Sequence, residues 1–228
     1  MKRWIAVLIL AGLSGSATAA AAQGGLSSLE IRVTPRVGVM TPADYFYEEF
    51  VHFGRDPVEW TEAFIYEAAV VGVTVEGELP GSGLWVRAEV LRTVDGILSM
   101  THAVLREASG FDPPRVERTP YRVATAVTVG TLDLALPTQF AIGPVQPYVI
   151  AGLGAKRYDF DTDPFVGLQD QVVLPQAGVV GVANLGAGMT VRLLGATLDL
   201  QVKDGISEYW GRVQHDVVVL GGVTWPVF

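Results

Sequence analysis

Charged side chains recur at alternate positions within several apolar stretches of this sequence. The charged set comprises Glu30, Arg32, Arg36, Glu76, Arg87, Glu89, Arg122 and Arg192. Because alternate side chains of a strand point to opposite faces, these groups share a face opposite valine and leucine. Acids and arginines on one enclosed face can neutralise one another in an ion-pair network, or they can line a pore. The sequence alone leaves both chemistries open.

Two other sets of residues could carry chemistry. Ser99 and His102 are three residues apart, and a histidine can activate a serine, although no orienting acid lies beside them in the sequence. Asp159, Asp161 and Asp163 alternate like calcium ligands, but the glycine and the distal glutamate of a calcium loop are missing. We interpret both sets as ordinary loop residues. No catalytic residue, metal site or cofactor is therefore predicted.

Eight stretches alternate between apolar and polar or small residues, and we interpret each as a β-strand. They are Leu29–Met40, Ile65–Glu78, Leu84–Val94, Tyr121–Leu136, Tyr148–Tyr158, Ala177–Arg192, Ala196–Lys203 and His215–Phe228. In Ala196–Lys203, for example, Leu198 and Leu200 alternate with Asp199 and Gln201. Eight strands leave little open width in a barrel, so we favour a filled polar lumen over a pore.

Local details of these strands give further expectations. Pro35 cannot donate to a ladder, which predicts a bulge or a gap at that point. The apolar phase changes near Gly130, which predicts a bulge there. The glycines on the polar face are expected to make room for long neighbouring side chains. They are Gly152, Gly154, Gly186 and Gly188.

The connections between the predicted strands are alternately long and short. The long ones are residues 41–64, 95–118, 159–175 and 204–214, and the short ones are 79–83, 137–147 and 193–195. We expect the first long connection to be a large aromatic and acidic loop with a helical turn at Pro42–Phe50. Alternation of this kind is typical of barrels in outer membranes, which have short turns on one side and long loops on the other.

The N-terminus predicts export. Lys2 and Arg3 precede an apolar core and a run of small residues, so residues 1–22 are interpreted as a signal peptide and 23–228 as the mature barrel domain. Removal of the two basic residues leaves 14 basic against 24 acidic residues, a net charge of −10. This balance argues against nucleic acid as a partner. The absence of cysteine excludes disulfides and thiolate chemistry.

Three segments carry a resemblance to a known family. They are PYVIAGLG at 147–154, NLGAGMTVR at 184–192 and the terminal GVTWPVF. With the signal peptide, they resemble the small eight-stranded outer-membrane barrels of the OmpA, OmpX and opacity-protein kind. The resemblance implies an all-β, antiparallel, up-and-down transmembrane barrel inserted by the barrel-assembly machinery. Trp225 and Phe228 are the implied C-terminal insertion signal, although Trp225 lies one position out of the usual phase unless Pro226 forms a bulge.

These observations predict a monomer in outer-membrane lipid, with a structural or surface-interaction role and a polar network filling its lumen. An alternative from the enzyme class is a lipid-modifying barrel that uses Ser99 and His102. A second alternative is a soluble secreted barrel that encloses an apolar ligand, which would require apolar side chains on the inner face.

Overall fold

The computed structural model describes residues 30–42, 47–51, 59–106, 115–161, 177–209 and 211–227, with backbone only for residues 47–51, 59 and 106. The expected signal peptide, Phe228, Asp163 and parts of all four expected long loops lie outside these residues. Within the described ranges, no helix is long and apolar enough to cross a membrane.

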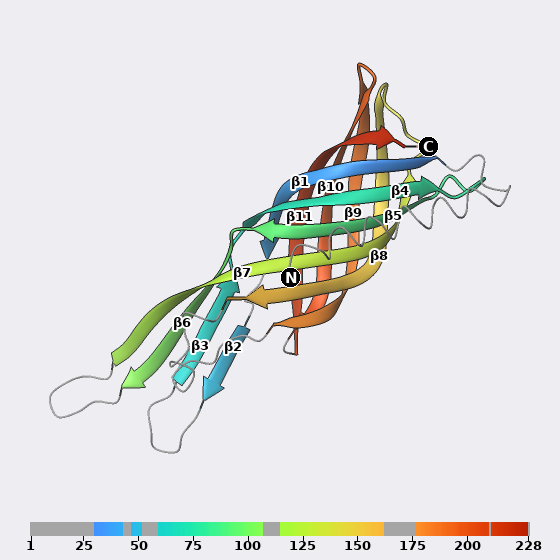
Figure 1. Ribbon diagram of the computed structural model, residues 1–228. Coiled ribbons are helices and arrows are strands. Elements are labelled where there is room, and N and C mark those ends of the chain that lie inside the picture. The colour runs from blue at the N-terminus through green and yellow to red at the C-terminus, as the bar shows by residue number, and fades with distance from the viewer. Residues whose placement is uncertain are drawn as a thin grey trace, which may run out of the picture.

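Eight antiparallel strands form a closed ring (Figure 1). In ring order they are β1 (Ile31–Pro42), β4 (Ala68–Glu78), β5 (Trp85–Val94), β7 (Arg115–Pro137), β8 (Val145–Phe160), β9 (Gly178–Leu193), β10 (Ala196–Tyr209) and β11 (Arg212–Pro226). The last strand, β11, pairs with the first, and the hydroxyls of Thr34 and Thr224 lie 2.8 Å apart across this seam. The expected eight-stranded antiparallel barrel is confirmed.

Four strands extend beyond one end of the ring as a second sheet, at the lower left of Figure 1. We call it the protruding sheet. It consists of β2 (Tyr47–Val51), β3 (Glu59–Ile65), β6 (Gly96–Arg106) and the first half of β7, residues 115–125. The expectation of loops at 41–64 and 95–118 is therefore wrong for much of both segments. No helical turn forms at 47–50, which belongs to β2.

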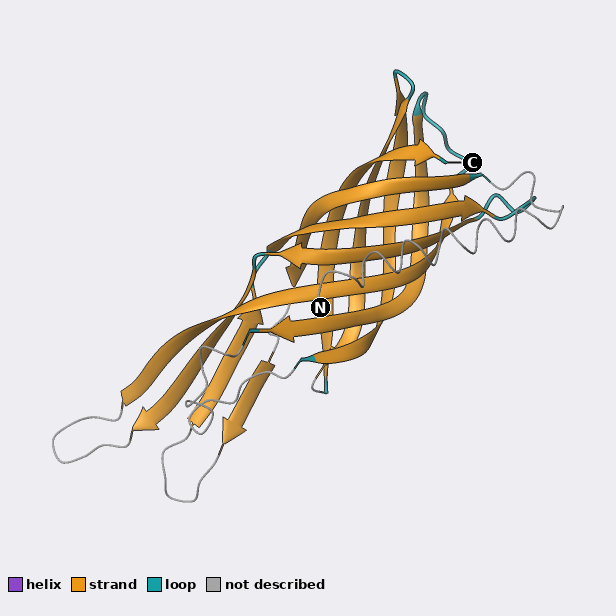
Figure 2. Ribbon diagram, in the orientation of Figure 1, coloured by secondary structure: helices purple, strands orange, loops and turns teal. Residues whose placement is uncertain are grey.

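The short connections lie at the opposite end of the ring, where Figure 2 shows them as teal loops between strands. They are residues 79–84, 138–144 and 194–195. Gly81 and Gly195 adopt positive φ angles of 72° and 87°, which glycine tolerates without steric cost. At the other end, the predicted loop at 204–214 is wrong, because β10 and β11 stay paired as far as Tyr209 and Arg212.

The outer face of the ring is aliphatic. Val37, Leu132, Leu153 and Leu185 each expose more than 60% of their surface, and other valines and leucines alternate with buried positions along the same strands. The inner face carries the buried polar side chains. This distribution is the inverse of a soluble domain, and it is the arrangement that a barrel in lipid requires.

Two expectations about register have different outcomes. Thr34 and Pro35 are skipped in the pairing of β1 with β11, while the pairing with β4 is continuous, so the predicted gap at Pro35 is confirmed. The predicted bulge at Gly130 is wrong, since β7 keeps one register with β5 and with β8 throughout. Val127 and Val129 face inward there because the lumen is apolar at that height.

Candidate functional site: the barrel lumen

The centre of the lumen holds a carboxylate that is shared by three donors. Asp199 on β10 accepts hydrogen bonds from Nη2 of Arg36 at 3.2 Å and from Nη2 of Arg87 at 2.9 Å. Tyr148 on β8 donates its hydroxyl to the other carboxylate oxygen at 2.5 Å. All four side chains are buried. Charge-assisted hydrogen bonds of this kind connect β1, β5, β8 and β10 across the interior.

A second carboxylate extends this network toward the protruding sheet. Oε2 of Glu89 on β5 accepts hydrogen bonds from Thr74 and from Gln201, both at 2.9 Å. Oε1 of Glu89 forms an ion pair with Lys203, which also lies 3.3 Å from Asp133. Glu89 and Asp133 therefore share the buried ammonium group of Lys203, so the interior charges compensate each other at close range.

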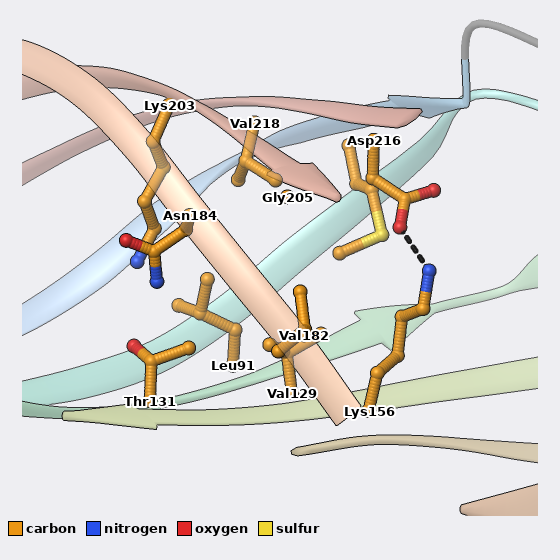
Figure 3. Close-up of a pocket in the computed structure, with 11 residues that line it drawn as sticks. Leu91, Val129, Thr131, Lys156, Val182, Asn184, Lys203, Gly205, Asp216 and Val218 are labelled. Atoms are coloured by element: carbon orange, nitrogen blue, oxygen red, sulfur yellow. Dashed lines mark hydrogen bonds and ion pairs between the residues drawn. The ribbon is translucent and has the colours of Figure 1, made fainter. Parts of the chain in front are cut away.

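The next layer away from the short turns is mainly apolar, with one buried ion pair between Lys156 on β8 and Asp216 on β11 (Figure 3). Apolar side chains from five strands line the same space. They are Met40, Leu91, Val129, Val182 and Val218. The cavity between them measures about 20 Å³, which is room for one water molecule but not for an organic ligand.

At the end with the short turns, the lumen opens into a vestibule of about 540 Å³. Arg32 lies 3.8 Å from Glu76 and 4.0 Å from the centre of the Trp85 ring, and Arg192 also lines the vestibule. A hydrogen bond from Arg32 lowers the pKa of Glu30 at the rim. The vestibule is thus a polar, water-accessible recess that ends at the Arg87–Glu76 ion pair.

The structure brings together most of the charged set predicted from the sequence. Arg36, Glu76, Arg87 and Glu89 are buried in the network. Glu30, Arg32 and Arg192 line the vestibule. Arg122 is a correction: it is exposed on the outer face of β7, because the inward positions of this strand are the odd-numbered ones from Val123 to Ala135.

Within the part of the chain that the structure describes, sequence reasoning left out five buried charged residues. They are Asp133, Lys156, Asp199, Lys203 and Asp216. Alternation with Leu198 and Leu200 does put Asp199 and Lys203 on the polar face, so the signal was present for these two. With the predicted residues, the buried set has five carboxylates and four cations, and Arg32 supplies a fifth cation at its edge.

Inward glycines make room for the network, as predicted. A Cβ atom at Gly188 would overlap the ring of Tyr148, and one at Gly152 would overlap the carboxylate of Asp133. Both glycines lie on strands that neighbour the residues they accommodate. A larger residue at either position would displace Tyr148 or Asp133 from the polar network.

The structure also places the residues on which the two alternative functions, a lipid-modifying enzyme and a ligand-carrying soluble barrel, depend. Ser99 and His102 lie on opposite faces of β6, because an odd separation along a strand reverses the direction of the side chain. They therefore do not form a serine–histidine pair. The interior at the level of Asp199 is charged rather than apolar, and the apolar layer encloses too little space for a carried ligand. Trp225, from the implied insertion signal, is exposed on the outer face of β11.

No protein-family model and no curated protein matches the chain. Among solved structures, outer membrane protein OprG from Pseudomonas aeruginosa matches with a TM-score of 0.50 at 13% identity, over 86% of this chain and 95% of that one. Neisserial surface protein A gives a TM-score of 0.46 at 10% identity, over 87% and 96%. Ail of Yersinia pestis, solved with the heparin analogue sucrose octasulfate, gives 0.40 at 10% identity, over 86% and 99%. The likeness to OprG, together with the closed ring and its aliphatic outer face, assigns this chain the fold of a small outer-membrane β-barrel.

Proposed function

We propose that the protein is a non-conducting barrel of the outer membrane that anchors the protruding sheet outside the bilayer, where the sheet serves as a contact surface. The observation that carries this proposal is the combination of an aliphatic outer face with a lumen occupied by the Asp199 and Glu89 networks. The short turns would face the periplasm, as in other outer-membrane barrels, and the protruding sheet the outside. Insertion as a monomer by the barrel-assembly machinery is part of the same proposal.

The proposed contact surface has exposed apolar side chains beyond the barrel. Tyr66 and Val116 each expose 44% of their surface, and Ile97 exposes 36%. Arg115 and Glu117 on β7 add an exposed ion pair beside Val116. Such a mixture of apolar and charged groups is typical of surfaces that contact other molecules.

Two measurements test the membrane and lumen parts of the proposal. After cell fractionation, the protein should require detergent for extraction. On a denaturing gel it should be heat-modifiable, which means that it migrates differently before and after boiling. Recovery in the soluble periplasmic fraction would contradict the membrane location. Purified protein in planar bilayers should give no steady current, because two layers of side chains block the lumen. A steady ion-selective current would contradict the closed lumen while leaving the membrane location intact.

A further inference from the structure

The exposed aliphatic side chains form a band around the ring, which we call the aliphatic band. At the edge of this band nearest the protruding sheet, two arginines lie in one row of the sheet. Arg92 on β5 pairs with Thr128 on β7, and Thr128 pairs with Arg157 on β8. All three positions have the outward parity of exposed Val90, Leu132 and Leu153 on the same strands. We call these three residues the arginine ridge. Since neighbouring strands are about 4.8 Å apart, the two arginine Cα atoms are about 10 Å apart, within reach of one shared anion.

The donors of the ridge are only partly used. Nη1 of Arg92 donates to the neutral hydroxyl of Thr128 at 3.2 Å, so this contact leaves the charge of Arg92 uncompensated. Nε and Nη2 of Arg157 bind Asp159 at 2.9 and 2.8 Å, and 62% of the Arg157 side chain is exposed. Two guanidinium groups with one carboxylate give the ridge a net positive charge, on a chain whose total charge is −8.

The surface next to the ridge is suited to an acyl chain. In the adjacent row toward the short turns, Val90 pairs with Gly130, and Gly130 pairs with Ala155. A Cβ atom added to Gly130 would meet nothing within 4 Å, so the surface is open there. The following row has Leu132 and Leu153, which are 61% and 69% exposed. A shallow apolar strip therefore begins directly beside the charged row, on its side toward the short turns.

We propose that the arginine ridge binds the phosphate of a lipid headgroup, whose acyl chains lie on the strip beside it. This inference rests on the proposed membrane location. Arginine presents a planar fork of donors that matches phosphate oxygens, and Thr128 lies between the two forks. The site is local to β5, β7 and β8, because the corresponding outer surface of β10 and β11 carries the Asp204–His215 pair instead.

The test uses the mature chain folded in phosphatidylcholine nanodiscs, with spin-labelled phosphatidic acid or spin-labelled phosphatidylcholine as the probe. Electron paramagnetic resonance measures the fraction of each probe that the protein immobilises. The unmodified protein should prefer phosphatidic acid. Arg92→Gln and Arg157→Gln should each lower this preference about fivefold, the ratio expected for one basic side chain near an anionic surface. Asp159→Asn should raise the preference, because it releases two donors of Arg157.

Arg122→Gln is the matched control, since Arg122 is exposed on β7 but is six residues away from Thr128, the ridge residue on that strand. It should leave the preference unchanged. Equal immobilisation of both probes by the unmodified protein would overturn the inference. Loss of the preference on addition of inorganic phosphate, but not of chloride at equal ionic strength, would show a site for free phosphate and overturn the lipid assignment. Failure of the proposed membrane location is distinguishable, because neither probe would then be immobilised and no heat-modifiable form would appear.

Discussion

Asp199 holds the central network of the lumen together, because it forms ion pairs with two buried arginines, Arg36 and Arg87. We predict that Asp199→Asn lowers the free energy of unfolding by about 3–5 kcal/mol, the usual cost of breaking a buried ion pair by removing one partner. The amide nitrogen would also face donors rather than acceptors. The change in unfolding free energy is measured by urea unfolding in lipid vesicles, with the loss of the heat-modifiable gel band as the readout.

Asp159→Asn is the control for this experiment, as it makes the same chemical change in an exposed ion pair with Arg157. Exposed pairs contribute about 0–1 kcal/mol. Similar losses for the two variants would show that the lumen is hydrated and that Asp199 is not the centre of a closed network.

At the residue scale, alternation predicted which side of a strand is polar but not which residues form pairs. Arg36 and Asp199 are 163 positions apart in the sequence, and their contact depends on ring closure. Lys156 follows Gly152 and Gly154 on the polar face of β8, yet its partner Asp216 lies on β11. Pairing across a lumen is a property of the closed barrel, and no local pattern encodes it.

Among the elements, the sequence pattern predicts the wrong inward face for the part of β7 before Gly130, and the reason is physical. Hydrophobicity marks the outer face only where the inner face is polar. Near the protruding sheet the lumen is apolar, so Val123, Val127 and Val129 face inward while Arg122 faces outward. The polar stretch 204–214 likewise lacks the alternation that predicts a strand, because strands beyond the bilayer need not alternate.

The same strand offers a sharp test of the membrane band. Leu132 and Ala124 both have the outward parity on β7, but they lie on opposite sides of Thr128. Leu132→Arg puts a charge in the middle of the aliphatic band and should destabilise the inserted barrel by about 2–4 kcal/mol. Ala124→Arg should cost much less, since it lies beyond the band. Refolding into vesicles in increasing urea gives both values, and equal costs would contradict the assigned band.

Thr34→Arg, which the strand pattern suggests as a mild change on the inner face, is unsuitable as a control. Thr34 has no exposed surface and shares a hydrogen bond with Thr224 across the seam. An arginine there would have to displace the Arg36 network. Alternation identifies the inner face, but the space available on that face depends on the packing of all eight strands.

For the whole molecule, a lumen closed by the Asp199 and Glu89 networks predicts that water in the vestibule does not pass on to the 20 Å³ cavity. The chain has no cysteine, so single cysteines report their own positions. Arg192→Cys in the vestibule should react with a water-soluble thiol reagent, because the vestibule is open. Gly205→Cys beside the 20 Å³ cavity should resist the same reagent in the folded protein.

Labelling of both variants after urea unfolding is the control for intrinsic reactivity. Rapid labelling at position 205 in the folded barrel would contradict the barrier formed by the Asp199 and Glu89 networks. Labelling at neither position would mean that the vestibule is closed as well.

The seam between β1 and β11 has a consequence for the order in which the protein can be assembled. Thr34 and Thr224 are 190 residues apart, so the ring can close only after β11, which follows the other seven ring strands in the sequence, has been synthesised. Until β11 arrives, β1 has a free edge of unpaired amides and carbonyls, which is a template for pairing with other chains. A chain truncated before β11 should therefore accumulate as aggregates or be degraded.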